Sequence, residues 1–226
     1  MKNKRGLFCI TTGLLLIAAA LAITGYNTWE DKQAEKTSDK VMEQLRVMVA
    51  EKTEPPAEPE IPEQQESLPA EIVTEEEIPD YILNPNMDMP TQAVDGYDYI
   101  GIIEIPASDI ALPVISEWNY PALKIAPCRF EGSVYTDDMI IAAHDYKAHF
   151  KRIRDLSGGE KVTFTDAAGN EFRYEVVNIE TVSGTDIEGL TSGEWDMTLF
   201  TCTSDGASRV VVRCERIDEE FYCEIQ

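Results

Sequence analysis

Residues 197–214 read MTLFTC-TSDGAS-RVVVRC, and this stretch decides the class of fold. Two runs rich in β-branched and other apolar residues, 197–202 and 209–214, flank a turn at 203–208. Two strand-forming runs separated by a short turn predict a pair of antiparallel strands. Cys202 then lies at the end of the first strand, and Arg209 begins the second.

Further short strands are predicted upstream, and they define the remainder of the fold. The run 139–143 is apolar throughout, which predicts a strand buried on both faces. Residues 161–165 and 171–177 alternate around Asp166–Asn170, which predicts a hairpin. A short helix is expected at 147–156. Together with the apolar runs 99–106 and 110–115, these short strands indicate a β-sandwich or a barrel.

The charge divides the chain of 226 residues into three zones. The net charge is −23, and hydrophobic residues make up 43%, which is enough for a core. Residues 1–25 carry three basic residues and no acid, whereas 26–95 carry 18 acids and five bases. Residues 96–226 hold the predicted strands and form the expected folded domain. The acidic balance excludes nucleic-acid binding through phosphates, because no basic surface is available.

The first zone, residues 1–25, is predicted to be a cytoplasmic tail and a transmembrane anchor. No charge occurs between Arg5 and Glu30, and about 18–20 apolar residues suffice to cross a membrane. The preceding basic residues predict an amino terminus inside and a domain outside. A cleaved signal peptide is the alternative, although the apolar run is long and no clean cleavage site follows it.

The second zone, residues 26–95, is predicted to be an acidic stalk. Residues 31–52 have a helical pattern without Pro or Gly. The tract at 54–63 is rich in Pro and Glu, so it cannot bury enough apolar surface to fold and is expected to be extended. Residues 81–95 regain apolar character and form a possible lid or docking segment ahead of the domain.

The chemistry available is one thiol, one imidazole and one guanidinium at strand ends. There is no C-x-x-C, no P-loop, no G-x-G-x-x-G and no G-x-S-x-G in the sequence, so metal, nucleotide and serine hydrolase sites lack their signatures. Cys202 and His144 each end a predicted strand, and a Cys with a His is a candidate nucleophilic pair. Arg209 would lower the thiol pKa or meet developing negative charge. The alternative is that Cys202 is a small apolar filler.

The string TLFTC at 198–202, followed by Arg209, resembles the TLxTC…R signature of sortases. Residues 141–144, IAAH, resemble the sortase strand that ends in the catalytic His, and the stretch from Ile125 to Tyr146 is similar to sortases of Gram-positive gut bacteria. The resemblance covers about residues 97–217. It implies a mainly β fold, a closed barrel of about eight strands with short helices.

The resemblance also implies an activity, a cysteine transpeptidase without a cofactor or metal. Cys202 would be the nucleophile, His144 the general acid and base, and Arg209 the group that stabilises the oxyanion. Thr198, Leu199 and Thr201 would bind substrate or shape the groove. The implied partners are secreted proteins with a carboxyl-terminal sorting signal and an amine of a cell-wall precursor or a pilin. The enzyme would sit in the cell membrane as a single-pass protein with an extracellular domain.

Two alternatives remain, namely a membrane-tethered β-barrel that binds or scaffolds without activity, and an ordinary cysteine peptidase. Sorting motif, choice between wall anchoring and pilus assembly, and oligomeric state stay open.

Several other residues have expected structural roles. Asp145 is expected to have a loop or surface role, because adjacent residues on an extended chain point opposite ways. His149 is expected to be structural, and Cys128 is expected to be a buried thiol in a loop. If residues 218 and 219 form a turn, Cys214 and Cys223 face each other, and a disulfide between them is an open possibility.

Overall fold

The computed structural model describes residues 3–53 and 79–218, with side chains placed from 8 to 47 and from 79 to 218. The helices are α1 (Asn3–Thr53), α2 (Asp80–Leu83), η1 (Pro106–Ser108), α3 (Tyr120–Leu123), η2 (Phe150–Asp155) and α4 (Ile187–Thr191). The strands are β1 (Gln92–Val94), β2 (Tyr97–Ile105), β3 (Ile110–Ile115), β4 (Cys128–Glu131), β5 (Met139–Ala143), β6 (Lys161–Asp166), β7 (Glu171–Ser183), β8 (Met197–Cys202) and β9 (Ser208–Arg216).

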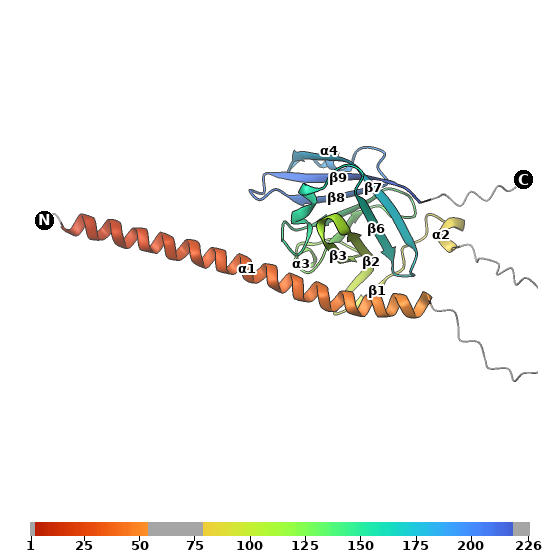
Figure 1. The fold of residues 1–226 in the computed structure, drawn as a ribbon, viewed down its shortest axis with the longest axis horizontal. Helices are drawn as coiled ribbons and strands as arrows, with labels where there is room; N and C mark the ends of the chain where they lie inside the picture. The colour runs from red at the N-terminus through yellow and green to blue at the C-terminus, as the bar shows by residue number, and fades with distance from the viewer. Residues whose placement is uncertain (1–2, 54–78, 219–226) are drawn as a thin grey trace, which may run out of the picture.

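The strands close into a barrel (Figure 1). The order β2-β3-β4-β5-β8-β9-β7-β6 returns to β2 through a β2–β6 pairing, so eight strands form the closed ring. The described strand β1 lies outside it and pairs with the start of β2. Closure satisfies the backbone groups that an open sheet would leave at its edges. The prediction of a mainly β fold with a closed barrel of about eight strands is confirmed.

Gly101 is the residue that permits closure. It pairs with Asp166 where β2 meets β6, next to a bulge in the β2–β3 pairing. A Cβ atom at this position would lie 2.2 Å from the Thr165 carbonyl oxygen and 2.8 Å from the Phe164 ring. The two strands therefore approach each other more closely than any side chain at this position would allow.

Alternation along the strands separates an inner core from an outer apolar layer. On β8, Met197 and Leu199 join the interior cluster, whereas Phe200 belongs to a second cluster outside the barrel wall. The same alternation divides β5, where Ile141 points inward and Ile140 outward. This strand is buried along its whole length, as its unbroken apolar sequence predicted. The outer face of β5, β8 and β9 is thus a covered surface and not a solvated one.

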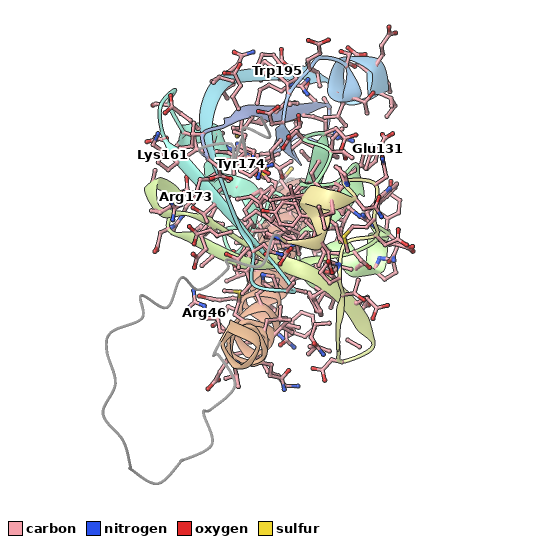
Figure 2. The ribbon with its side chains drawn as sticks, turned by 90° about the vertical axis from the view of Figure 1, so that its right-hand side faces the viewer. Arg46, Glu131, Lys161, Arg173, Tyr174 and Trp195 are labelled. Carbon is pink, nitrogen blue, oxygen red and sulfur yellow. The ribbon has the colours of Figure 1, made fainter. Side chains whose placement is uncertain are left out.

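The long helix α1 packs along the barrel. Val41, Met42 and Leu45 are buried in a cluster with residues of β2, β3 and β4. Arg46 Nη2 lies 2.8 Å from Glu104 Oε1, and Lys40 Nζ lies 2.6 Å from Asp95 Oδ2. Figure 2 looks nearly along α1 and shows it beneath the barrel. The helical pattern at 31–52 is therefore confirmed, and this part of the predicted stalk lies against the barrel.

Other differences from the sequence-based expectations are local. The short helix expected at 147–156 is present as a 3₁₀-helix at Phe150–Asp155, which begins three residues later than predicted. Cys128 was expected in a loop, but it is the first residue of β4, which is only four residues long. β1 was not predicted either, because three residues carry no periodic signal. The Pro/Glu tract lies outside the described residues.

We predict that Gly101→Ala lowers the free energy of unfolding by about 1–3 kcal/mol, because the added methyl group forces β2 and β6 apart. Urea unfolding of the whole chain in detergent measures this change. The matched control is Gly158→Ala, where a Cβ would meet its nearest neighbour, the Val176 carbonyl oxygen, at 3.7 Å. The control is expected to change stability by less than about 1 kcal/mol. Equal stability of both variants would contradict the role given to Gly101.

Candidate functional site

The three residues singled out by the sequence lie in one row on the outer face of the barrel. β5 and β8 pair in parallel with Ala143 opposite Thr201, so the next step places His144 beside Cys202. β8 and β9 pair in antiparallel fashion with Cys202 directly opposite Arg209. Cross-strand neighbours project from the same face of a sheet. The row therefore brings an imidazole, a thiol and a guanidinium together at one end of the barrel.

His144 is held in a partly buried pocket. Its ring stacks on Tyr146 with a centroid separation of 4.8 Å. Its Nε2 atom is buried and has no hydrogen-bond partner among the described residues. Burial lowers the pKa of His144 below its ordinary value, the positive charge of Lys124 lowers it further, and Glu30 of α1 opposes both. The neutral imidazole is therefore the favoured form near neutral pH.

The Arg209 side chain is hydrogen-bonded to the turn between β8 and β9. Its Nη1 atom donates to the carbonyl oxygens of Ser208 and Gly206, at 3.0 and 3.3 Å. The same atom would lie 3.1 Å from a Cβ on Gly184, so the guanidinium rests over that glycine. Nε and Nη2 have no hydrogen-bond partner in the part of the chain that the structure describes. The cation is thus anchored at one nitrogen, and its Nε and Nη2 atoms are left as donors.

A polar bridge joins the loop after β5 to the turn after β8. Asp145 forms an ion pair with Arg154 of η2, and its other carboxylate oxygen accepts a hydrogen bond from Ser204 Oγ at 3.0 Å. Arg154 Nη1 also donates to Ser204 Oγ at 3.4 Å. His144 and Cys202 precede the two bridged residues by one and two positions. The expected loop role of Asp145 is therefore a specific one, which the sequence did not indicate because its partners are distant in the chain.

The three residues predicted to bind substrate are buried. Leu199 lies in the inner core, and Thr201 Oγ1 donates to the Ala143 carbonyl oxygen at 2.9 Å. Thr198 Oγ1 accepts a hydrogen bond from Arg213 at 3.1 Å. No surface of these side chains is left for a ligand in this structure, so packing and groove shaping fit them better than direct contact does.

Arg213 holds α4 against the outer face. It is almost completely buried and donates to the carbonyl oxygens of Gly189 and Leu190, at 2.6 and 2.8 Å. It also pairs with Glu180 at 2.9 Å. A buried arginine needs such partners, since an unpaired buried charge is strongly destabilising. Leu190 of α4 thereby covers the outer cluster next to Phe200.

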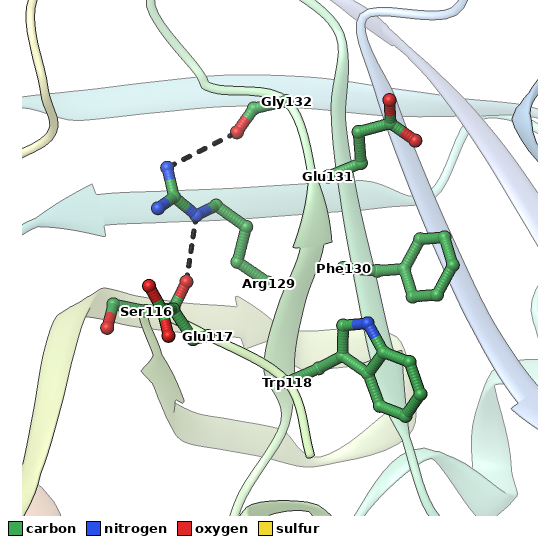
Figure 3. Close-up of a pocket in the computed structure, with 7 residues that line it drawn as sticks. All are labelled: Ser116, Glu117, Trp118, Arg129, Phe130, Glu131 and Gly132. Atoms are coloured by element: carbon green, nitrogen blue, oxygen red, sulfur yellow. Dashed lines mark hydrogen bonds between the residues drawn. The ribbon is translucent and has the colours of Figure 1, made fainter.

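A pocket of about 420 Å³ opens beside this outer cluster (Figure 3). Trp118 stacks on Phe130 at a centroid separation of 5.5 Å, and Phe130 meets Phe200 edge-on at 5.5 Å. Arg129 closes one side by donating to the carbonyl oxygens of Ser116 and Gly132. Phe200 is two residues before Cys202 and points to the same face. An aromatic path therefore leads from the pocket toward the row.

The segment predicted as a possible lid begins with α2, which packs against aromatic rings of the barrel. Tyr81 of α2 stacks on Tyr135 at 4.9 Å and lies 5.2 Å from the Phe172 ring. Arg216, at the end of β9, lies over the same Phe172 ring. Arg209 is the second residue of β9 and Arg216 the last, so α2 lies at the end of the barrel opposite Cys202. The contacts of Tyr81 do not test a lid formed by residues 81–95, which stays a prediction.

Among the described residues, the other Cys and His side chains lie outside the row. Cys128 and Cys214 are buried, and burial raises the pKa of each thiol to about 12, so both stay protonated. His149 is buried beside Tyr146, and burial lowers its pKa to about 4. Cys223 lies outside the described residues, so its pairing with Cys214 stays a prediction.

Opposite shifts in the titration of His144 are expected when its two charged neighbours are removed. Lys124→Gln removes a cation, so the pKa of His144 rises, whereas Glu30→Gln removes an anion, so it falls. Proton NMR of the imidazole signals against pH measures both. The chain has two His, and His149 titrates near pH 4, so the signals are separable. Shifts of the same sign in the two variants would contradict the electrostatic account.

The fold is similar to those of solved sortase structures. The sortase A from Corynebacterium diphtheriae is 24% identical, with a TM-score of 0.50, over 56% of this chain and 64% of its own. The chain thus spans a little under two thirds of that protein. A sortase C from Clostridium perfringens, solved with the C-terminal cell wall sorting motif, is 26% identical, with a TM-score of 0.50, over 62% of this chain and 89% of its own. No curated protein matches the chain.

The sortase domain family model matches residues 103–217, which is half of the chain and runs from β2 to the end of β9. This match includes all three residues of the row, and it agrees with the closed eight-stranded barrel and its solved neighbours. The chain belongs to the sortase family.

Proposed function

We propose that the protein is a membrane-anchored cysteine transpeptidase that cleaves a carboxyl-terminal sorting signal of secreted proteins and transfers the cleaved protein to an amine. The observation that carries this proposal is the row of His144, Cys202 and Arg209 on one face, set by the registers of β5, β8 and β9. Family membership supports the reaction class.

The first half of the reaction forms a thioester. Cys202 Sγ attacks the carbonyl carbon of the scissile peptide bond, and the thiol proton passes to the neutral imidazole of His144. The oxyanion is stabilised by the free donors of Arg209. The carbon–nitrogen bond breaks, His144 returns its proton to the leaving amine, and an acyl group remains on Cys202. The lowered pKa of His144 suits this order of steps, because the imidazole must be neutral to accept the thiol proton.

The second half releases the acyl group to an acceptor. A neutral amine attacks the thioester carbonyl carbon while His144 accepts its proton, and Arg209 again stabilises the oxyanion. The carbon–sulfur bond breaks and the thiolate of Cys202 recovers the proton from His144. The proposed acceptor is an amine of a cell-wall precursor or of a pilin, with water as the alternative that gives hydrolysis. The steps need only groups in the row, and we propose no metal or organic cofactor.

The aromatic path gives the sorting signal an apolar surface to bind. Trp118, Phe130 and Phe200 lead from the pocket toward Cys202, and apolar side chains of an extended peptide gain free energy by burial there. One solved neighbour contains a sorting motif, which supports a peptide of this class as the substrate.

The amino-terminal helix supports a location of the protein in the membrane. Among the described residues one helix, within Phe8–Val47, is long and apolar enough to cross a bilayer. The basic residues before it favour an amino terminus inside and a barrel outside the cell. A membrane-tethered barrel that binds without catalysis is the competing function. The row of a thiol, an imidazole and a guanidinium favours the enzyme, since a binding barrel does not require all three groups.

The decisive experiment incubates the full chain in detergent with a library of sorting peptides and a soluble amine. The full chain is needed because Val41, Met42 and Leu45 of α1 belong to a core cluster that truncation would expose. We expect a thioester on Cys202 and a transpeptidation product by mass spectrometry, and neither with Cys202→Ala. Arg209→Gln is expected to lower kcat by about 10²–10³. A folded wild-type chain that gives no product with any peptide would favour the binding barrel.

The polar bridge at Asp145 is expected to position the row. Arg154→Gln removes the ion pair with Asp145 and leaves the Ser204–Asp145 hydrogen bond to hold the loops of His144 and Cys202, so the bridge loosens. A displacement near 1 Å lowers kcat by up to about 10²-fold. The matched control is Arg152→Gln on the same 3₁₀-helix, whose side chain contacts the exposed Asp109 and the Ser108 carbonyl oxygen and no residue of the bridge. Steady-state kinetics should show reduced kcat with little change in KM for Arg154→Gln only. A loss confined to KM would contradict positioning.

A further inference from the structure

The contacts of α1 show which end of the barrel lies closest to the apolar part of the helix. Glu30 pairs with Lys124 at 3.3 Å and accepts a hydrogen bond from Tyr146 at 3.5 Å, and Asp31 accepts one from the Ala148 amide at 3.4 Å. These are the first contacts of the helix, and they lie in or beside the loop that begins with His144. Among the described side chains of α1 the last ion pair, Arg46 with Glu104, lies about 24 Å further along the axis than Glu30, at 1.5 Å per residue.

Figure 1 shows the same polarity, because the turn between β8 and β9 lies at the end of the barrel that faces the amino terminus of α1. The row of His144, Cys202 and Arg209 lies at that end. The apolar part of α1 extends beyond the barrel in the same direction.

The apolar part of α1 ends close to these first contacts. Leu14, Leu15 and Leu16 point in three directions and are all exposed, so the helix is apolar on every side, as a lipid-embedded helix is. The last aliphatic residue is Ile23. Tyr26 and Trp29 follow, both exposed, and residues of these types favour the membrane interface. Glu30 lies about 10 Å beyond Ile23 along a continuous helix, whereas a headgroup layer is about 5–8 Å thick.

We propose that α1 acts as a ruler, which holds the Cys202 end of the barrel against the outer surface of the lipid bilayer. The inference rests on the proposed function for its substrate, which is a polypeptide held in the same membrane. The helix is rigid because it is continuous from Asn3 to Thr53 and docked by Ser38, Val41 and Leu45. The row therefore sits about 10 Å above the hydrocarbon boundary, and it selects substrates by the distance of the scissile bond from the membrane.

This height predicts a spacing in the substrate. An extended peptide rises about 3.3 Å per residue, so about three to five residues separate the scissile bond from the membrane-embedded segment. Shorter spacers do not reach Cys202, and longer ones carry the bond past it.

The test lengthens α1 between its apolar part and its contacts with the barrel. Seven helix-forming residues inserted between Asn27 and Thr28 add about 10 Å and nearly two full turns, so the docking face of α1 keeps its direction. The full chain is placed in lipid nanodiscs with membrane-anchored substrates whose spacers range from 2 to 12 residues. The best spacer should lengthen by about three residues. The matched control places the same insertion between Glu63 and Gln64, after α1, and should leave the best spacer unchanged.

A soluble sorting peptide distinguishes failure of the ruler role of α1 from failure of the proposed transpeptidase function. Its turnover should be equal in the wild type and in both insertion variants, because the row itself is unaltered. An unchanged best spacer in the α1 variant, or a shift in the control variant, would overturn the ruler while turnover of the soluble peptide persists. Loss of soluble turnover in the wild type would instead reject the proposed function.

A second measurement tests the ruler without activity. A fluorophore on Cys202, in a chain carrying Cys9→Ser and Cys223→Ser, transfers energy to dye-labelled lipid headgroups of the nanodisc. Transfer should be high in the otherwise native chain, lower after the insertion in α1, and unchanged after the insertion at residue 63. Low transfer in the native chain would place Cys202 far from the membrane and refute the proposal.

Discussion

The parallel pairing of β5 with β8 is the constraint on which the rest of the site depends. These strands are far apart in the sequence, and their register places His144 one step beyond Ala143 and beside Cys202. A shift by one residue would turn the thiol into the barrel and leave the imidazole outside. Barrel closure at Gly101 protects this register, because every strand of the ring then has two neighbours.

The docking of α1 changes how the acidic region before the barrel is understood. A sequence with a Pro/Glu tract predicts a spacer between the membrane and the domain. In the structure, the helix that carries the apolar segment also contributes Val41 and Leu45 to a cluster with Tyr99 and Cys128. The helix and the barrel therefore share apolar surface. The same helix places Glu30 close to His144, where its charge affects the titration of the imidazole.

Much of the barrel was predictable because its strands carry local signals. β5, β8 and the hairpin of β6 and β7 have apolar or alternating patterns and clear turns, and their predicted positions agree closely with the structure, except that β7 continues six residues beyond the predicted end at Val177. β1 and β4 were missed because three or four residues are too short for a period. The bridge of Asp145, Arg154 and Ser204 was missed because its members are distant in the chain and individually ordinary.

The sequence by itself determined the kinds of chemistry available: one thiol at a strand end, one imidazole after an apolar run, one arginine across a short turn, and an apolar helix behind basic residues. These are local properties, so composition and periodicity reveal them. Only the tertiary structure decided that the three side chains share one face, that Thr198, Leu199 and Thr201 are buried, and that α1 lies against the barrel. Those facts depend on strand register and on contacts between residues far apart in the chain, and neither is encoded in a local pattern.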